Sequence, residues 1–211
     1  MAYPVSFDVQ PPQTFDKAQV VLRILLFLVL SWFLNGILGA AYWLLPIIAA
    51  IMIAQKGAAT YLAEAEKGPT MWLRYIMGAY SYLALASDKL PFEHPEEVDL
   101  KVQPSGTPSV GSALLRIILA IPHAIVLGIL GFVFFFIWII SAISILINET
   151  YPDWAQNFIR GYLRWTARVL AYLASLVDEY PPFSFDSGEA APAALPPTQP
   201  SGGEASGSGT T

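Results

Sequence analysis

The chain has 211 residues, of which 55% are hydrophobic and 13% are charged. Soluble domains carry about 25% charged residues, so this composition excludes an ordinary soluble domain and indicates a protein in or on a bilayer. The net charge of -5 argues against a nucleic-acid-binding protein, and the absence of cysteine excludes disulfides and thiolate metal sites. We expect no metal and no cofactor.

Two nearly identical heptamers, VSFDVQP at 5–11 and VDLKVQP at 98–104, each precede a long apolar stretch. Apolar and polar residues alternate in both, which predicts two strands with one buried face. The segment before the first apolar stretch has no basic region and no early apolar core, so we do not expect a secretory signal peptide. Because two strands alone are marginally stable, we expect the opening and closing strands of both halves to meet in one small cytosolic sheet.

The first apolar stretch, 18–55, is too long for one membrane span of about 20 residues and suits two short ones. Asn35-Gly36 is a turn dipeptide near its middle, and the same register places Gly128 in the middle of the second stretch, 112–148. We therefore predict two helical hairpins. Arms of about 25 Å are shorter than the hydrocarbon core of about 30 Å, so the hairpins either span a thinned bilayer, which we favour, or end inside it as wedges.

The eleven basic residues all lie away from the two predicted turns. The positive-inside rule then places both termini, the sheet and the surface helices on the cytoplasmic side. The sequence predicts a multi-pass protein of the cytoplasmic (inner) membrane of a bacterium.

An amphipathic surface helix is predicted after each hairpin, at about 58–87 and 152–177. In the second, Arg160, Arg164 and Arg168 recur every fourth position opposite an apolar face, which is typical of a helix in the membrane surface that contacts anionic lipid headgroups. Alternatively, these arginines pair with Asp178, Glu179 or Glu149. Further candidate contacts are Arg74, which is the matching arginine of the first helix, and Arg23 and Arg116, which we interpret as snorkelling anchors that pair with Asp16 or with lipid phosphate.

Ordered blocks of the two halves match each other. Arg23 corresponds to Arg116 in the register of the heptamers, and Arg74, Tyr82 and Asp88 correspond to Arg164, Tyr172 and Asp178 in a slightly shorter one. This pattern predicts a mainly α membrane protein of two tandem repeats, 1–93 and 94–187, each a strand, a hairpin, a surface helix and a short closing strand. Residues 188–211 lack aromatic and bulky aliphatic side chains and are predicted to be a disordered tail.

His123, after Pro122, is the candidate intramembrane polar site. Such a residue marks a functional site by default. We nevertheless favour a hydrogen-bonded imidazole in a bent helix, because the first half has Val29 and Leu30 at these positions. The acidic cluster around His94 fits a solvated linker better than a metal site. Because no nucleotide-loop, hydrolase or zinc motif occurs, we expect no enzyme activity.

Three segments, YPVSFDV, LRIILAIPHAIVLGILGF and FIRGYLRWTARVLAYLASLVDEYPPFSF, resemble the bacterial membrane-protein family described as domain of unknown function 4389. The resemblance covers the second half and, in diverged form, the first, which implies two tandem copies and supplies no activity. We expect a non-enzymatic scaffold or interaction module for lipid, for an unknown membrane protein or for a second copy. Alternatives are a channel or transporter subunit with a path near His123, and a lipid-modifying enzyme without a nameable nucleophile.

Overall fold

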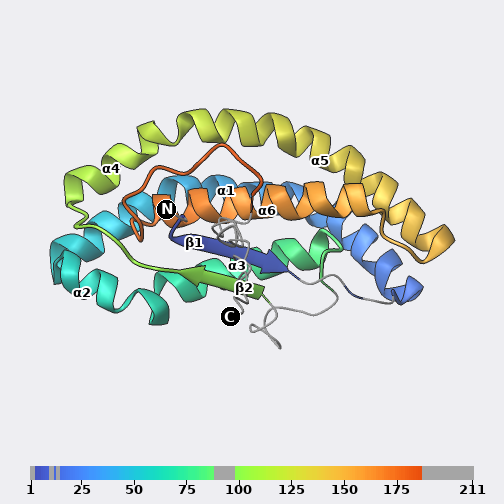
Figure 1. Cartoon of the computed structure of the whole chain (residues 1–211), viewed down its shortest axis with the longest axis horizontal. Coiled ribbons are helices and arrows are strands. Elements are labelled where there is room, and N and C mark those ends of the chain that lie inside the picture. Colours follow the sequence, from blue (N-terminus) through green and yellow to red (C-terminus); the bar gives the residue numbers. More distant parts are fainter. Residues whose placement is uncertain (1–2, 10–11, 13–14, 88–97, 187–211) are drawn as a thin grey trace, which may run out of the picture.

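The computed structural model describes residues 3–9, 12, 15–87 and 98–186. The first half contains β1 (Val5–Val9), α1 (Lys17–Lys56), α2 (Ala58–Ala63), the 3-10 turn η1 (Ala65–Lys67) and α3 (Pro69–Leu83). The second half contains β2 (Val98–Val102), α4 (Val110–Leu119), α5 (Ile121–Asn148) and α6 (Asp153–Leu173). In Figure 1, α4 and α5 form one arc along the molecule, and α6 lies between this arc and the two strands. The fold is mostly helical with one two-stranded sheet.

The two heptamers form the predicted strands and pair with each other. β1 and β2 are antiparallel, and the central pair joins Phe7 to Leu100, which are the corresponding residues of the two heptamers. Val5, Phe7 and Val9 are at most 2% exposed, so the predicted alternation is confirmed.

The closing strand predicted at the end of the second half is not formed, since residues 180–186 have no strand structure. Pro181 and Pro182 lack the N–H groups that a strand ladder needs, and Phe183 and Phe185 pack against helices instead. The corresponding segment of the first half and the predicted tail 188–211 lie outside the described residues.

The first predicted hairpin is wrong, because α1 is one helix from Lys17 to Lys56. Its start is capped by Asp16, whose carboxylate accepts a hydrogen bond from the Ala18 N–H at 2.9 Å. The helix continues through Asn35, Gly36 and Pro46. A glycine inside a helix costs only about 1 kcal/mol, whereas a turn in an apolar stretch would leave several backbone groups without partners.

The second hairpin is also absent, because α5 continues through Gly128. The chain breaks earlier, at Ala120, where α4 ends and Pro122 occupies the first turn of α5. Proline is tolerated there because the N–H of a first-turn residue has no helical partner. The break therefore bends a rod and does not reverse the chain.

The second predicted surface helix corresponds to α6, but it is an internal helix. Ile159, Leu163 and Leu173 are at most 1% exposed, and α6 packs against α1, α3, α4, α5 and β1. The apolar side that the sequence assigned to lipid therefore contacts other helices. The first predicted surface helix is divided into α2, η1 and α3, with Glu64 and Gly68 at the junctions.

Candidate membrane face and arginine framework

The α6 arginines hold β1. Arg160 donates to both carboxylate oxygens of Asp8, at 2.6 and 2.8 Å from Nη2. Arg164 donates to Asp8 at 2.8 Å and, from Nε, to the Phe7 carbonyl at 3.1 Å. Partial burial opposes the charge of Asp8, but the hydrogen bonds and charges of Arg160 and Arg164 outweigh it and lower the pKa of Asp8. Arg160 and Arg164 therefore pair inside the chain, as the alternative prediction held, but with Asp8 and not with the predicted Asp178, Glu179 or Glu149.

Arg74 on α3 does the same for β2. Its Nη2 donates to the Leu100 carbonyl at 3.1 Å and to Glu66 at 2.9 Å. Each strand of the two-stranded sheet thus receives a guanidinium hydrogen bond on a carbonyl of its central residue. Such bonds protect open strand edges, which otherwise attract other chains.

Arg116 is not a snorkelling anchor, because its side chain is 4% exposed. It donates to the Tyr172 carbonyl at 2.8 Å, to the Val177 carbonyl and to Asp178. Its guanidinium also lies 4.6 Å from the centre of the Tyr172 ring, a cation–π distance. Arg116 therefore joins α4 to the end of α6.

Arg23 is equally buried, at 1% exposure. It donates to the Ser87 carbonyl at 2.8 Å and to Gln19 at 3.0 Å, and it lies 4.1 Å from the centre of the Tyr82 ring. Arg23 joins α1 to the segment after α3, as Arg116 joins α4 to the segment after α6. The predicted snorkelling role is wrong for both residues.

Arg168 is 1% exposed and donates to the Ser184 carbonyl at 3.3 Å. Its guanidinium also lies 6.0 Å from the centre of the Tyr3 ring. All six arginines predicted to meet headgroups therefore have partners inside the chain. Their role toward lipid stays a prediction.

Several contacts connect corresponding residues of opposite halves. Tyr61 donates to the Ala174 carbonyl, and Tyr151 donates to the Ala84 carbonyl at 3.3 Å. In the register read from the sequence, Tyr61 corresponds to Tyr151 and Ala84 to Ala174. Each half therefore donates the same tyrosine hydrogen bond to the other half. The hydrogen bonds of Arg74 to β2 and of Arg164 to β1 correspond in the same way.

The ends of α3 and α6 also match. Leu85 and Ser175 have φ of 62° and 55°, a left-handed conformation that commonly ends helices. It is unusual for a bulky residue such as leucine. Leu85 is fully buried, so packing holds it there.

His123 lies in an aromatic enclosure. Trp165 Nε1 donates to His123 Nδ1 at 3.0 Å, and the Phe183 ring stacks on the imidazole at 4.0 Å. Accepting at Nδ1 places the ring proton of a neutral imidazole on Nε2. His123 is 0% exposed, which agrees with the simpler hypothesis of a hydrogen-bonded core histidine. The neighbouring Pro122 only begins α5.

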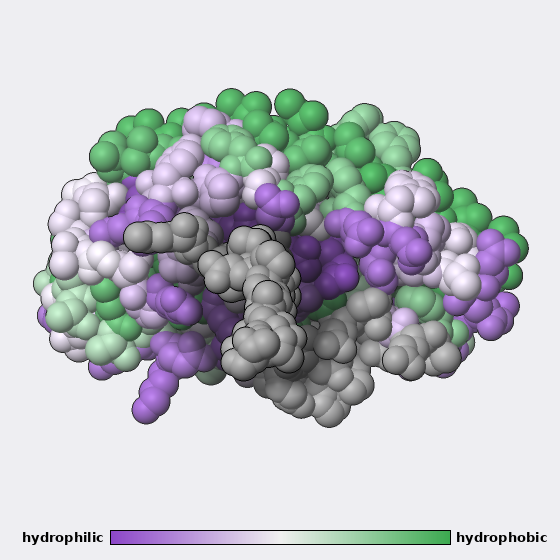
Figure 2. Space-filling model, in the orientation of Figure 1, coloured by the Kyte–Doolittle hydropathy of each residue, from purple (hydrophilic) through white to green (hydrophobic). Residues whose placement is uncertain are grey.

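The molecule has a continuous apolar surface, which we call the apolar face and define as the outer sides of α1, α4 and α5. On α1 the exposed apolar residues include Val21, Leu25, Trp32, Trp43 and Ile51, and on α5 they include Ile125, Ile129, Phe132, Ile140 and Ile147. They recur every three or four positions and so form one stripe along each helix. Figure 2 shows hydrophobic residues gathered along the edge that α4 and α5 form, while hydrophilic residues lie across the middle.

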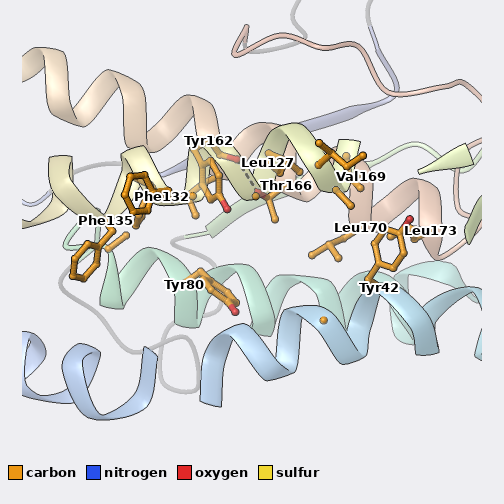
Figure 3. Close-up of a pocket in the computed structure, with 18 of the residues that line it drawn as sticks. Tyr42, Tyr80, Leu127, Phe132, Phe135, Tyr162, Thr166, Val169, Leu170 and Leu173 are labelled. Atoms are coloured by element: carbon orange, nitrogen blue, oxygen red, sulfur yellow. Dashed lines mark hydrogen bonds between the residues drawn. The ribbon is translucent and has the colours of Figure 1, made fainter. Parts of the chain in front are cut away.

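A cavity of about 920 Å³ is lined by residues of α1, α3, α5 and α6. Side chains from all four helices converge on it, among them Tyr42, Tyr80, Phe132 and Leu170 (Figure 3). None of the described residues that line it is charged. No sequence pattern indicates this cavity, because its lining residues come from both halves of the chain.

Two helical segments, Gly39–Lys56 and Ile121–Asn148, are long and apolar enough to cross a membrane. Length and composition alone are weak evidence, because a buried core helix passes the same test. Both segments here are mostly exposed, with 28% and 11% of the hydrophobic windows buried. This exposure distinguishes them from core helices of soluble proteins.

Comparison with known families agrees with the resemblance read from the sequence. Residues 111–184 match the model of the family Domain of unknown function (DUF4389). The match supports this family for the second half. One DUF4389 copy is found and not the two predicted. No curated protein and no solved structure matches the chain.

Sequence reasoning missed the acid that serves Arg160 and Arg164. Asp8 lies on the polar side of a strand that the pattern identified, but no periodicity links that strand to a helix so distant along the chain. The aromatic partners of His123 were missed for the same reason. The available signal was the aromatic-rich end of the second half, PPFSF, which we read as a strand.

Proposed function

We propose that the protein is a non-enzymatic membrane-bound module that organises lipid or a partner protein, with its apolar face embedded in the bilayer and its sheet in water. The observation that carries the proposal is the pair of unbroken apolar stripes on α1 and α5. Burying such stripes in hydrocarbon gains about 25 cal/mol per Å² of apolar surface. Exposed patches of this extent mark an interaction surface on soluble proteins as well.

The length of the stripe on α1 favours a helix that lies along the membrane. From Val21 to Ile51, the stripe on α1 extends about 45 Å, whereas the hydrocarbon core is about 30 Å thick. To span, α1 would need a tilt of about 50°, beyond the usual range of about 0–40°. We therefore propose that α1 lies along the membrane, in place of the spanning hairpin expected from the sequence.

The position of the strands supports the same orientation. β1 and β2 lie beside the middle of the long helices and not beyond their ends (Figure 1). A transverse crossing would place the partly exposed Asp8–Arg160 pair at the depth of the hydrocarbon, where an ion pair is costly. In the proposed orientation this pair remains in water.

The ends of the apolar face carry exposed ion pairs, Lys17 with Glu149 at 2.8 Å and Lys56 with Glu64 at 2.6 Å. Helix ends in the headgroup layer keep both pairs hydrated. We propose that the protein lies on the cytoplasmic side of the inner membrane with both termini there, and that its two halves descend from one duplicated unit.

Single cysteines at Ala18 and Gln55, at opposite ends of α1, test this topology in a chain without cysteine. Both residues are exposed. We expect an impermeant thiol reagent to label neither in intact cells and both after permeabilisation. Labelling of one end in intact cells would show that α1 spans, and would overturn the proposed orientation.

Vesicle flotation tests the apolar face itself. Phe132 and Ile129 are 68% and 63% exposed, and their replacement by Glu places a charge in the hydrocarbon at a cost of about 3 kcal/mol each. We expect the double variant to lose flotation. Gln103→Glu, an exposed change beside β2, is the control and should float.

Lipid composition tests the headgroup prediction in the same assay. If Arg160, Arg164, Arg168, Arg74, Arg23 and Arg116 remain in their internal contacts, flotation should differ little between neutral and anionic vesicles. A strong anionic preference that Arg160→Gln removes would support the headgroup role. The alternative channel function has its own test, which is ion flux in proteoliposomes that His123→Ala abolishes.

A further inference from the structure

The cavity lies between α1 and α5, the two helices that carry the apolar stripes. Helices α1, α3, α5 and α6 all line it (Figure 3). Gly39 on α1 and Gly128 and Gly131 on α5 belong to this lining, and we call the part that α6 contributes the floor. A Cβ atom added at Gly39 or at Gly128 meets nothing within 4 Å. Glycines therefore keep room between two helices that could carry larger residues.

The lining selects for hydrocarbon. Its polar groups include the hydroxyls of Tyr42 and Thr166, which already donate to backbone carbonyls, at 2.7 Å to Ile117 and at 2.9 Å to Tyr162. The remaining wall is mainly Phe, Leu, Ile, Val and Ala. The hydroxyls of Tyr80 and Tyr162 also line the cavity, but none of the described lining residues carries a charge. A charged ligand would therefore lose its hydration there without a counter-charge.

The rim of the cavity belongs to the apolar face. Trp43, Ile125 and Phe132 line the cavity and are 58%, 59% and 68% exposed. The mouth therefore opens among residues that the proposed orientation places in the bilayer. The nearest abundant apolar molecule is then a lipid tail.

We propose that this cavity takes one acyl chain of a bilayer phospholipid, whose headgroup stays outside among the neighbouring lipids. The inference rests on the proposed membrane orientation. The volume of about 920 Å³ is at the upper end of the range of about 300–1,000 Å³ for small-molecule pockets. The chain tip would contact the α6 floor at Leu163 and Leu170, which are buried at 1% and 4% exposure.

Photocrosslinking locates the chain. The full-length protein is reconstituted in vesicles with phosphatidylcholine that carries a diazirine near the end of one acyl chain, and the adducts are mapped by mass spectrometry. We expect adducts on the stripes of α1 and α5 and also on the floor between Leu163 and Leu173. Adducts on the stripes alone would overturn acyl entry and leave membrane docking intact, whereas no adducts at all would overturn both.

Glycine variants test whether the adducts on the floor depend on the empty volume of the cavity. Gly39→Leu and Gly128→Leu fill the cavity with side chains and should raise helix propensity. Floor adducts should fall about tenfold, the change that a loss of about 1.4 kcal/mol in binding produces, while stripe adducts stay constant. Gly36→Leu is the matched control, because an added Cβ at Gly36 also meets nothing within 4 Å and Gly36 does not line the cavity. Unchanged floor adducts in both filled variants would contradict the proposal.

Discussion

The long helix of the first half is unbroken over Lys17–Lys56, whereas the corresponding stretch of the second half is divided at Ala120 into α4 and α5. Despite this difference, Arg23 and Arg116 make corresponding contacts, each with a carbonyl in the segment after the last helix of its half and with a tyrosine ring. The tertiary contacts are therefore conserved between the halves where the local helix geometry is not. A helix with an exposed outer side tolerates a bend, but a buried guanidinium needs its partners.

The two halves differ in charge at one pair of corresponding positions. Arg160 of α6 pairs with Asp8 of β1. The corresponding positions hold Thr70, which is buried, and Lys101, which pairs with Asp99 at 2.9 Å.

We expect the largest loss of unfolding free energy for Arg116→Ala and Arg23→Ala, which test whether the two buried arginines are equivalent. Each removes a buried guanidinium and leaves backbone carbonyls unsatisfied, which costs about 3–5 kcal/mol of unfolding free energy. Unfolding in mixed micelles by denaturing detergent measures the loss. Arg116→Lys is the conservative control and should recover part of it. If one alanine variant were silent, the two arginines would not be equivalent.

We expect an intermediate loss of unfolding free energy for Tyr61→Phe and Tyr151→Phe, which remove the two corresponding hydrogen bonds between the halves. Each removes one hydroxyl from a buried carbonyl, at a cost of about 1–2 kcal/mol. We expect the smaller loss at Tyr151, whose hydrogen bond is 3.3 Å long. The double variant, measured in the same unfolding assay, should lose the sum of the single losses, because separate sites add. A strongly non-additive result would mean that the contacts are not independent copies.

Asp8→Asn should have the smallest effect, about 1 kcal/mol, because the Asp8 side chain is 44% exposed and solvent weakens the ion pair. The control is Asp99→Asn at the cross-strand partner of Asp8, which should lower the unfolding free energy less. The Arg partners lower the pKa of Asp8, so this contribution is complete above the usual carboxyl pKa of about 3.9 and is lost as pH falls through the lower folded-state value. An unfolding free energy of Asp8→Asn with the same acid dependence as the wild type would contradict this assignment.

The strands and the correspondence of the arginines could be predicted from sequence, because alternation and spacing are local signals. The hairpins could not, since Asn35-Gly36 favours a turn only where water or protein can satisfy the exposed backbone. The burial of α6 was not predictable either. An amphipathic helix shows the same periodicity whether lipid or another helix covers its apolar side. Arg160, Arg164 and Arg168 look like headgroup ligands until the strand that carries Asp8 is placed beside them.

The register that pairs Phe7 with Leu100 makes the two-stranded sheet self-complementary. When a residue pairs with its own counterpart in an antiparallel ladder, the ladder is unchanged by a half-turn, which is the geometry of an isologous dimer contact. The same ribbon could therefore be assembled from two separate short chains without redesigning either edge. The covalent connection between β1 and β2 fixes the stoichiometry of a contact that the strands could make alone.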